Sequence, residues 1–145
     1  MKPMQDNHNK VFIDSNVVIY AYSNSEHAKQ QIARNIVSEN YTVISTQVLQ
    51  EISNILGSKY KLDYASIKDT LQECIYSNNE VYTNNQQTIL QACDIAERYR
   101  FSFYDSLIIA AALTTKCSVL YSEDLQNNQI IEGVLTIINP FLIDN

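Results

Sequence analysis

The sequence predicts an α/β fold: a three-layer α/β/α sandwich around a mostly parallel sheet of about five strands. Short apolar runs of strand length alternate along the chain with longer stretches of helical period. The 145 residues are 46% hydrophobic and 18% charged, which suits one domain with a single core. Only two Gly and two Pro are present, too few for a turn-rich all-β protein or an evident linker.

The first forty-five residues predict two strands and two helices. VFI at 11–13 is a short apolar run of strand type, and we interpret the apolar VVIYAY at 17–22 as a short helix. Residues 25–40 place apolar side chains on one side of a helix and charged ones elsewhere. YTVIS at 41–45 is rich in residues that favour strands and predicts the second strand.

The middle of the chain predicts two more helices. Ser45 or Thr46 can cap the start of the helix at 45–57, and Gly57 suits its C-terminal end. Its Glu51 lies at the margin of the apolar stripe, where it can face a cleft. A further helix is expected at 63–76.

The last part of the chain completes the alternation of strands and helices. A weak strand at 80–83 precedes a helix at 86–99, and a helix at 103–116 precedes strands at 118–122 and 134–138. The inner face expected for the first of these helices consists of Ile89, Leu90, Cys93, Ala96 and Tyr99.

Composition limits where the protein works. Residues 1–10 form a polar extension that we expect to be disordered, without the apolar segment of a signal peptide, before a single domain at 11–145. No apolar run is long enough to cross a membrane. Three scattered cysteines match no zinc motif, so we expect reduced core thiols. These features predict a cytoplasmic protein.

The net charge of −6 argues against tight binding of nucleic acid through its phosphates alone. It favours a basic partner or divalent cations.

The stretch FSFYDSLIIAAAL at 101–113 raises a question, because one acid, Asp105, stands before an unbroken apolar run. Ser102 and Asp105 fit a capping pattern, and the helix dipole favours a carboxylate in the first turn. Capping alone therefore explains Asp105, unless other acids converge on the same place.

Three further acids are expected at the same edge of the sheet. Asp14 directly follows the first strand, Asp124 follows the strand at 118–122, and Glu51 stands in the helix after the second strand. Asp105 begins a helix antiparallel to the strands, so it lies at their carboxyl ends, where α/β proteins bind ligands. Singly, Asp14 can be a helix cap, Glu51 a solvated residue and Asp124 a turn residue. We expect Glu123, the neighbour of Asp124, to be an outward surface residue.

Four carboxylates at one place repel one another unless protons or cations neutralise them. Oxygen ligands without nearby His or Cys suit Mg²⁺ or Mn²⁺ rather than Zn²⁺. Such an ion can activate water and stabilise charge on a phosphoryl oxygen, which is chemistry for phosphodiester cleavage.

The ordered segments VFIDSNVVIYAY, STQVLQEI, SFYDSLIIAAAL and LYSEDLQNNQIIEGVLTIINPF resemble the PIN domain, and more closely the VapC-type toxins of bacterial toxin–antitoxin pairs. The resemblance implies a magnesium- or manganese-dependent endoribonuclease. The family's acidic site maps onto Asp14, Glu51, Asp105 and Asp124, with Ser15, Asn16 and Ser122 as supporting residues. The resemblance also implies a homodimer and an antitoxin that covers the active site, often with a basic side chain among the carboxylates.

Contacts to RNA are less defined. Lys59, Lys61 and Lys68, together with Arg98 and Arg100, are candidates for phosphate contacts, and Tyr60 can stack on a base. Solvated surface charge and a packing tyrosine explain the same residues as well.

Two other functions stay open. A catalytically silent PIN-like module that binds RNA or protein needs no metal. An aspartate-based phosphohydrolase needs a second acid two residues after the first, where this chain has Asn16.

Overall fold

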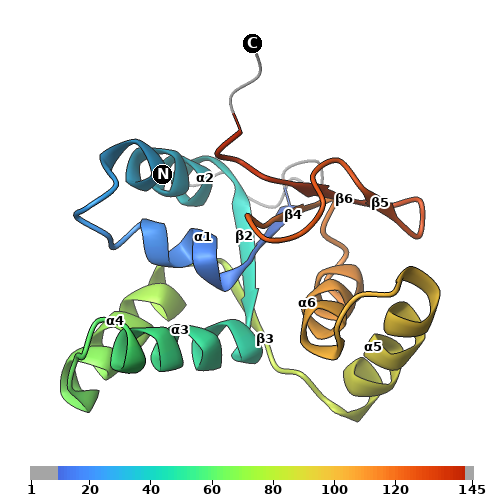
Figure 1. Ribbon diagram of the computed structural model, residues 1–145, viewed down its shortest axis with the longest axis horizontal. Helices are drawn as coiled ribbons and strands as arrows, with labels where there is room; N and C mark the ends of the chain where they lie inside the picture. The colour runs from blue at the N-terminus through green and yellow to red at the C-terminus, as the bar shows by residue number, and fades with distance from the viewer. Residues whose placement is uncertain (1–9, 143–145) are drawn as a thin grey trace.

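The computed structural model describes residues 10–142, and over this range strands and helices alternate as the sequence predicts (Figure 1). One sheet runs through the molecule in the strand order β3-β2-β1-β4-β6-β5, and all neighbouring strands are parallel except β5 and β6. The strands are β1 (Lys10–Ile13), β2 (Tyr41–Ser45), β3 (Glu80–Tyr82), β4 (Val119–Tyr121), β5 (Ile130–Ile131) and β6 (Leu135–Ile138).

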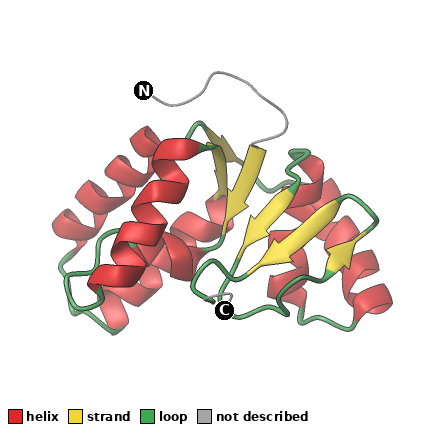
Figure 2. Ribbon diagram, turned by 90° about the horizontal axis from the view of Figure 1, so that it is seen from above, coloured by secondary structure: helices red, strands yellow, loops and turns green. Residues whose placement is uncertain are grey.

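Helices cover both faces of the sheet, which confirms the three-layer sandwich (Figure 2). The first four helices cover one face and the last two cover the other. This division follows from the strand order, because the chain moves outward from β1 to β3 and then returns to place β4 on the opposite side of β1. The helices are α1 (Ser15–Tyr20), α2 (His27–Glu39), α3 (Thr46–Ser58), α4 (Tyr64–Ser77), α5 (Gln86–Tyr99) and α6 (Phe103–Thr114).

Local side chains fix where most helices begin. Ser45, Asp63 and Ser102 each accept a hydrogen bond from the backbone N–H three residues later. Asn85 does the same at the start of α5, where Thr88 completes a capping box. The predicted caps at Ser45 and Ser102 are therefore confirmed.

The core lies on both faces of the central strands. Phe12, Ile44 and Leu120 on β1, β2 and β4 are fully buried. Helix α6 is buried along its whole middle, from Ser106 to Ala112, because it packs between the sheet and α5. An apolar helix with no polar face can only be stable in such a place.

Some predicted boundaries were wrong. Residues 1–9 of the predicted extension lie outside the described residues, but Lys10 belongs to β1. Gly57 lies within α3 rather than ending it, since the helix continues to Ser58. The sheet of about five strands is confirmed: within residues 10–142 it has six, since the short antiparallel β5 also pairs with β6.

The predicted inner face of α5 was wrong at three positions and held at the end of the helix, where Ala96 and Tyr99 are half-buried and Tyr99 packs against the core. Ile89, Leu90 and Cys93 are exposed, while Thr88, Ala92 and Ile95 are buried. Ala92 packs in a small cluster with Leu107 and Ala110 of α6, so the small side chains of the two helices face each other.

The cysteines and the lengths of the apolar helices were also predicted from composition. All three cysteines are free, as predicted, but only Cys74 and Cys117 are buried. No helix within residues 10–142 is long and apolar enough to cross a membrane.

Candidate active site

The candidate site lies where the strand order reverses. β1 and β4 are parallel neighbours in the middle of the sheet, and their chains continue in opposite directions across it. Asp14 follows β1, and its backbone N–H donates to the Tyr121 carbonyl at 3.0 Å. Ser122 follows β4, so both chains leave the sheet side by side. This is the position at which open α/β sheets form binding crevices.

Asp14 is the buried centre of the site, with 8% of its surface exposed. Its Oδ1 accepts from the Ser15 N–H at 2.8 Å, which caps α1, and its Oδ2 accepts from the Ser122 hydroxyl at 2.9 Å. Burial raises its pKa from 3.8 to about 6 against the opposing effect of these two hydrogen bonds, and the charges of Glu51 and Asp105 raise it further. No Lys or Arg of residues 10–142 contributes to the pKa of Asp14, so an ionised Asp14 has no counter-charge from this part of the chain.

Glu51 reaches Asp14 from α3. Ser15 donates its hydroxyl to Glu51 Oε1 at 2.9 Å, and Gln47 donates its Nε2 to Glu51 Oε2 at 3.2 Å. The same Gln47 nitrogen donates to the Tyr104 carbonyl at 3.0 Å, which ties α3 to the start of α6. Glu51 is half-buried, as its predicted place at the stripe margin requires.

Asp105 reaches the site from the first turn of α6, the helix that Ser102 caps. Its backbone N–H donates to the Ser102 hydroxyl at 3.2 Å. Its carboxylate is close enough for its charge to raise the pKa of Asp14. The cap at this helix start is therefore the Ser102 side chain, and the Asp105 carboxylate in the first turn lies near Asp14.

Asp124 closes the site from the loop after β4. It is exposed, and its Oδ2 accepts from Asn16 Nδ2 at 2.8 Å. Its backbone N–H donates to the Ser122 hydroxyl at 3.3 Å, and that hydroxyl in turn bonds Asp14. The three predicted supporting residues Ser15, Asn16 and Ser122 each join one acid to another part of the site.

Glu123 does not point outward as predicted. The Lys29 ammonium donates to Glu123 at 2.6 Å, and the Tyr20 hydroxyl also donates to Glu123, at 2.8 Å. Burial raises the pKa of Glu123, but the hydrogen bonds from Lys29 and Tyr20 outweigh burial and lower it below the usual value. The Lys29 ammonium also lies 4.6 Å from the Tyr20 ring centre. The loop that carries Asp124 is thereby fastened to α1 and α2.

Among known protein families, one matches most of this chain. The family model described as the PIN domain matches residues 11–130. The chain belongs to the PIN domain family. No curated protein matches it in sequence.

Solved structures with the fold of this PIN domain come from several bacteria. A toxin–antitoxin complex from Klebsiella pneumoniae matches with a TM-score of 0.67 at 16% identity, over 92% of this chain and 99% of that one. VapC20 of Mycobacterium tuberculosis, described as a sarcin-ricin loop cleaving toxin, matches with 0.64 at 18%, over 79% and 89%. DNA-bound VapBC from Salmonella typhimurium matches with 0.62 at 21%, over 88% and 97%. At these identities the likeness establishes the fold alone.

The donor set of this PIN domain suits a hard cation, although its spacing does not form a closed metal site. The carboxylates of Glu51 and Asp105 lie near Asp14, and the Asn16 Oδ1 is buried without a hydrogen-bond partner among the described residues. Within residues 10–142, no three Asp, Glu, His or Cys side chains are grouped tightly enough to hold an ion. Hydrogen bonds from Ser15, Gln47 and Asn16 hold Glu51 and Asp124 in their present places.

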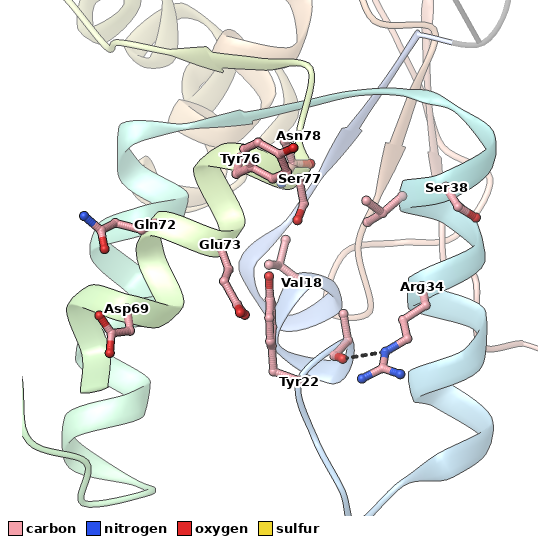
Figure 3. A pocket seen from close by; sticks show the side chains of 12 residues that line it. Val18, Tyr22, Arg34, Ser38, Asp69, Gln72, Glu73, Tyr76, Ser77 and Asn78 are labelled. Carbon is pink, nitrogen blue, oxygen red and sulfur yellow. Dashed lines mark hydrogen bonds between the residues drawn. The ribbon is translucent and has the colours of Figure 1, made fainter. Parts of the chain in front are cut away.

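Two of the cavities of this PIN domain differ in their relation to the acids. A cavity of about 1220 Å³ opens between α1, α2 and α4 and contains none of the four acids (Figure 3). Tyr22, Glu73 and Tyr76 line it, and across it Arg34 donates to the Ala21 carbonyl at 3.0 Å. A second cavity, of about 660 Å³, includes Ser15 and Glu51 and so adjoins the acids.

None of the predicted RNA contacts lines the cavity of this PIN domain that includes Ser15 and Glu51. Lys59 follows Glu51 by eight residues, about 12 Å along the helix, and lies 5.5 Å from the Tyr60 ring centre. Lys61, Lys68 and Arg100 are exposed. Arg98 forms an ion pair with Glu132 on the far hairpin, so it is engaged elsewhere.

Sequence reasoning missed two residues of the site, Gln47 and Lys29. Gln47 stands one helical turn before Glu51, and that spacing is the signal that could have found it. Lys29 had no such signal, because its partner Glu123 is far away in the sequence.

Proposed function

We propose that this PIN-domain protein is a Mg²⁺- or Mn²⁺-dependent endoribonuclease and the toxin of a toxin–antitoxin pair. The observation that carries the proposal is the burial of the Asp14 carboxylate beside the charges of Glu51 and Asp105, with no cation from residues 10–142 acting on it. Among the solved structures of this fold are toxin–antitoxin complexes and one toxin described as cleaving the sarcin-ricin loop, which supports the same reading.

The four acids and the two serines of the site have different roles in this proposal. Asp14, Asp105 and Asp124 would hold the ion directly or through water, and Glu51 would complete the shell or orient the attacking water. When bound, the ion supplies a nucleophilic hydroxide and stabilises charge on the phosphoryl oxygen. Ser15 and Ser122 fix the carboxylates of Glu51 and Asp14 through their hydroxyls, so these two acids are oriented before any ion enters.

The partners follow from the same proposal. An antitoxin is expected because it could place a basic side chain among these acids, and the net charge of −6 favours a basic partner. A homodimer and a cytoplasmic location also belong to the proposal. Light scattering of the purified chain, alone and with the protein encoded beside it, tests both associations.

The two other functions are less well supported. A silent binding module has no need for acids that repel one another at a buried centre. A phosphohydrolase would use an acid at position 16, whereas Asn16 donates its amide to Asp124.

The decisive experiment is cleavage of a pool of cellular RNAs by the purified protein with Mn²⁺, with Mg²⁺ and with a chelator. Asp105→Asn removes one acid of the site, and Asp94→Asn makes the same change at an exposed acid of α5. Discrete cuts that need metal, vanish in Asp105→Asn and persist in Asp94→Asn are the expected result. A folded protein that cuts no RNA with either metal, or an Asp105→Asn variant that cuts as wild type does, would overturn the proposal.

A further inference from the structure

The polar cavity of about 660 Å³ beside the acids has a composition of its own. It lies between α3 and the start of α6, and we call it the amide cavity; it is lined by Ser15, Gln47, Gln50, Glu51, Asn54, Ile55 and Tyr104. Ser15 and Glu51 belong to both the amide cavity and the acidic site, where they share a hydrogen bond. A molecule in the amide cavity is therefore in contact with the acidic site.

The charge of the amide cavity excludes a phosphate as its occupant. Among residues 10–142, Glu51 is the sole charged residue in its lining, and neither lysine nor arginine contributes. An anionic group would meet a carboxylate with no counter-charge. The occupant that fits is a neutral group with hydrogen-bonding edges.

Three amide side chains supply the matching edges. Gln50 and Asn54 are exposed and stand one turn apart on α3, so both present a donor and an acceptor on the same side of the helix. Amides of this kind form paired hydrogen bonds with the edges of nucleobases.

Gln47 adds an independent indication of a ligand. It is 4% exposed, and its nitrogen is engaged by Glu51 and the Tyr104 carbonyl. Its Oε1 is buried and has no hydrogen-bond partner in the part of the chain that the structure describes. Because buried amide oxygens almost always have a partner, one supplied from outside the chain is expected here.

Tyr104 supplies a flat apolar surface. It is 66% exposed although it directly precedes Asp105, and its ring packs edge-on against Phe103 at 5.4 Å between centres. An aromatic ring held in this way can stack on an unpaired base.

We propose that the amide cavity binds one unpaired nucleobase of the RNA, next to the bond that is cut. In this arrangement Gln50 and Asn54 read the edge of the base and Tyr104 stacks on its face. The cavity would then set the sequence preference of the enzyme. This inference rests on the proposed function, because it assumes that RNA enters the acidic site.

Binding of uncharged nucleosides tests the amide cavity without catalysis, phosphate or metal. The side-chain amide NMR signals of Gln47, Gln50 and Asn54 in the ¹⁵N-labelled full chain would be followed during titration with adenosine, guanosine, cytidine and uridine. We expect saturable shifts with a subset of the four nucleosides. The double variant Gln50→Ala/Asn54→Ala should weaken this binding about fivefold or more. Gln72→Ala, the same substitution at the other cavity, should leave it unchanged.

A second measurement uses cleavage of a randomised single-stranded RNA pool with Mn²⁺, followed by sequencing of the cut ends. Wild type should prefer one base at a fixed position beside the cut, and the double variant should lose this preference about fivefold or more. Tyr104→Ala should reduce cleavage of single strands relative to Tyr104→Phe, which keeps the stacking surface.

The outcomes separate the two proposals. The proposal that the amide cavity binds a nucleobase is overturned if nucleosides shift none of the three amide signals saturably. It is also overturned if they bind the double variant as well as wild type. A base preference that the double variant retains overturns it as well. If no RNA is cut with either metal, the ribonuclease proposal fails, and the nucleoside titration still decides whether the cavity binds a base.

Discussion

Asp14→Asn should change how the stability of the metal-free protein depends on pH. The carboxyl of Asp14 has a pKa of about 6 in the folded protein and 3.8 as its ordinary value. The folded state therefore holds this proton over a range where the unfolded state has lost it. Stability from this group is complete below about pH 4 and is lost as the pH rises through about 6.

The magnitude follows from the size of the shift. A difference of about two pKa units corresponds to about 3 kcal/mol, which is the cost of ionising Asp14 in the folded protein at neutral pH. Asparagine carries no charge and avoids this cost. Its oxygen can still accept from the Ser15 N–H, and its nitrogen can donate to the Ser122 hydroxyl. The variant should thus lose little hydrogen bonding.

Urea unfolding followed by far-UV circular dichroism, with chelator present, measures the effect. The free energy of unfolding of Asp14→Asn minus that of wild type should rise by about 3 kcal/mol from about pH 4 to about pH 7. Other titrating groups are common to both proteins and largely cancel in the difference. Asp94→Asn, at an exposed acid, serves as the control and should give a flat difference.

A flat difference for Asp14→Asn as well would refute the reasoning, since it would mean that Asp14 is already ionised without cost. Mn²⁺ provides a second check. It should stabilise wild type more at about pH 7 than at about pH 5, because protons compete with the cation for Asp14.

Three further predictions concern packing, capping and the loop of Asp124. Ile95→Ala, at a buried site of α5, should lower the free energy of unfolding by about 2–5 kcal/mol. Leu90→Ala, at a side chain that is 58% exposed, should lower it by less than about 0.5 kcal/mol. Equal effects of the two variants in urea unfolding would contradict the observed buried face of the helix. Asn85→Ala should lower the free energy of unfolding by about 1 kcal/mol because the α5 cap is lost, whereas Asn85→Asp should retain the cap. If urea unfolding shows as large a loss for Asn85→Asp as for Asn85→Ala, a capping role is ruled out. Lys29→Met should lower the thermal midpoint of unfolding and weaken Mn²⁺ uptake in a titration, because it removes the ion pair that holds the loop next to Asp124. Lys68→Met, at an exposed lysine, should do neither. Unaltered Mn²⁺ uptake in Lys29→Met would show that the loop keeps its place without the ion pair.

The parts of the fold that could be predicted from sequence depend on local chemistry. Asp14 and Ser102 mark helix starts because their side chains cap the following helices. The apolar run after Asp105 has no polar face, so it can only be a buried helix. Because each of three acids stands next to a strand end or a helix start, alternation of elements was enough to bring them to one edge.

The missed features depend on packing between distant segments. The buried face of α5 is set by close contact of Ala92 with α6, which the larger side chains Ile89 and Leu90 would prevent. Their size misled a prediction based on hydrophobicity alone. Strand β5 has two residues, too few for any period to be recognised, and it exists because β6 pairs with it.

The same reasoning explains Glu123, whose environment is set by Lys29, 94 residues away in the chain. A turn sequence such as SEDLQNNQ gives no sign of a distant lysine.

The pairing of β1 with β4 has a consequence for how the protein is made. The hydroxyl of Ser122 reaches Asp14 across 108 positions of the chain, and Asn16 reaches Asp124 across the same span. A ribosome making this chain releases Asp14 early, yet the middle of the sheet stays incomplete until β4 has left the exit tunnel. Every truncated or nascent product that stops short of residue 119 therefore lacks one wall of the acidic site. The acids are assembled only after β4 has been synthesised, so a cell that makes this protein meets the complete site only in chains that extend past Asp124.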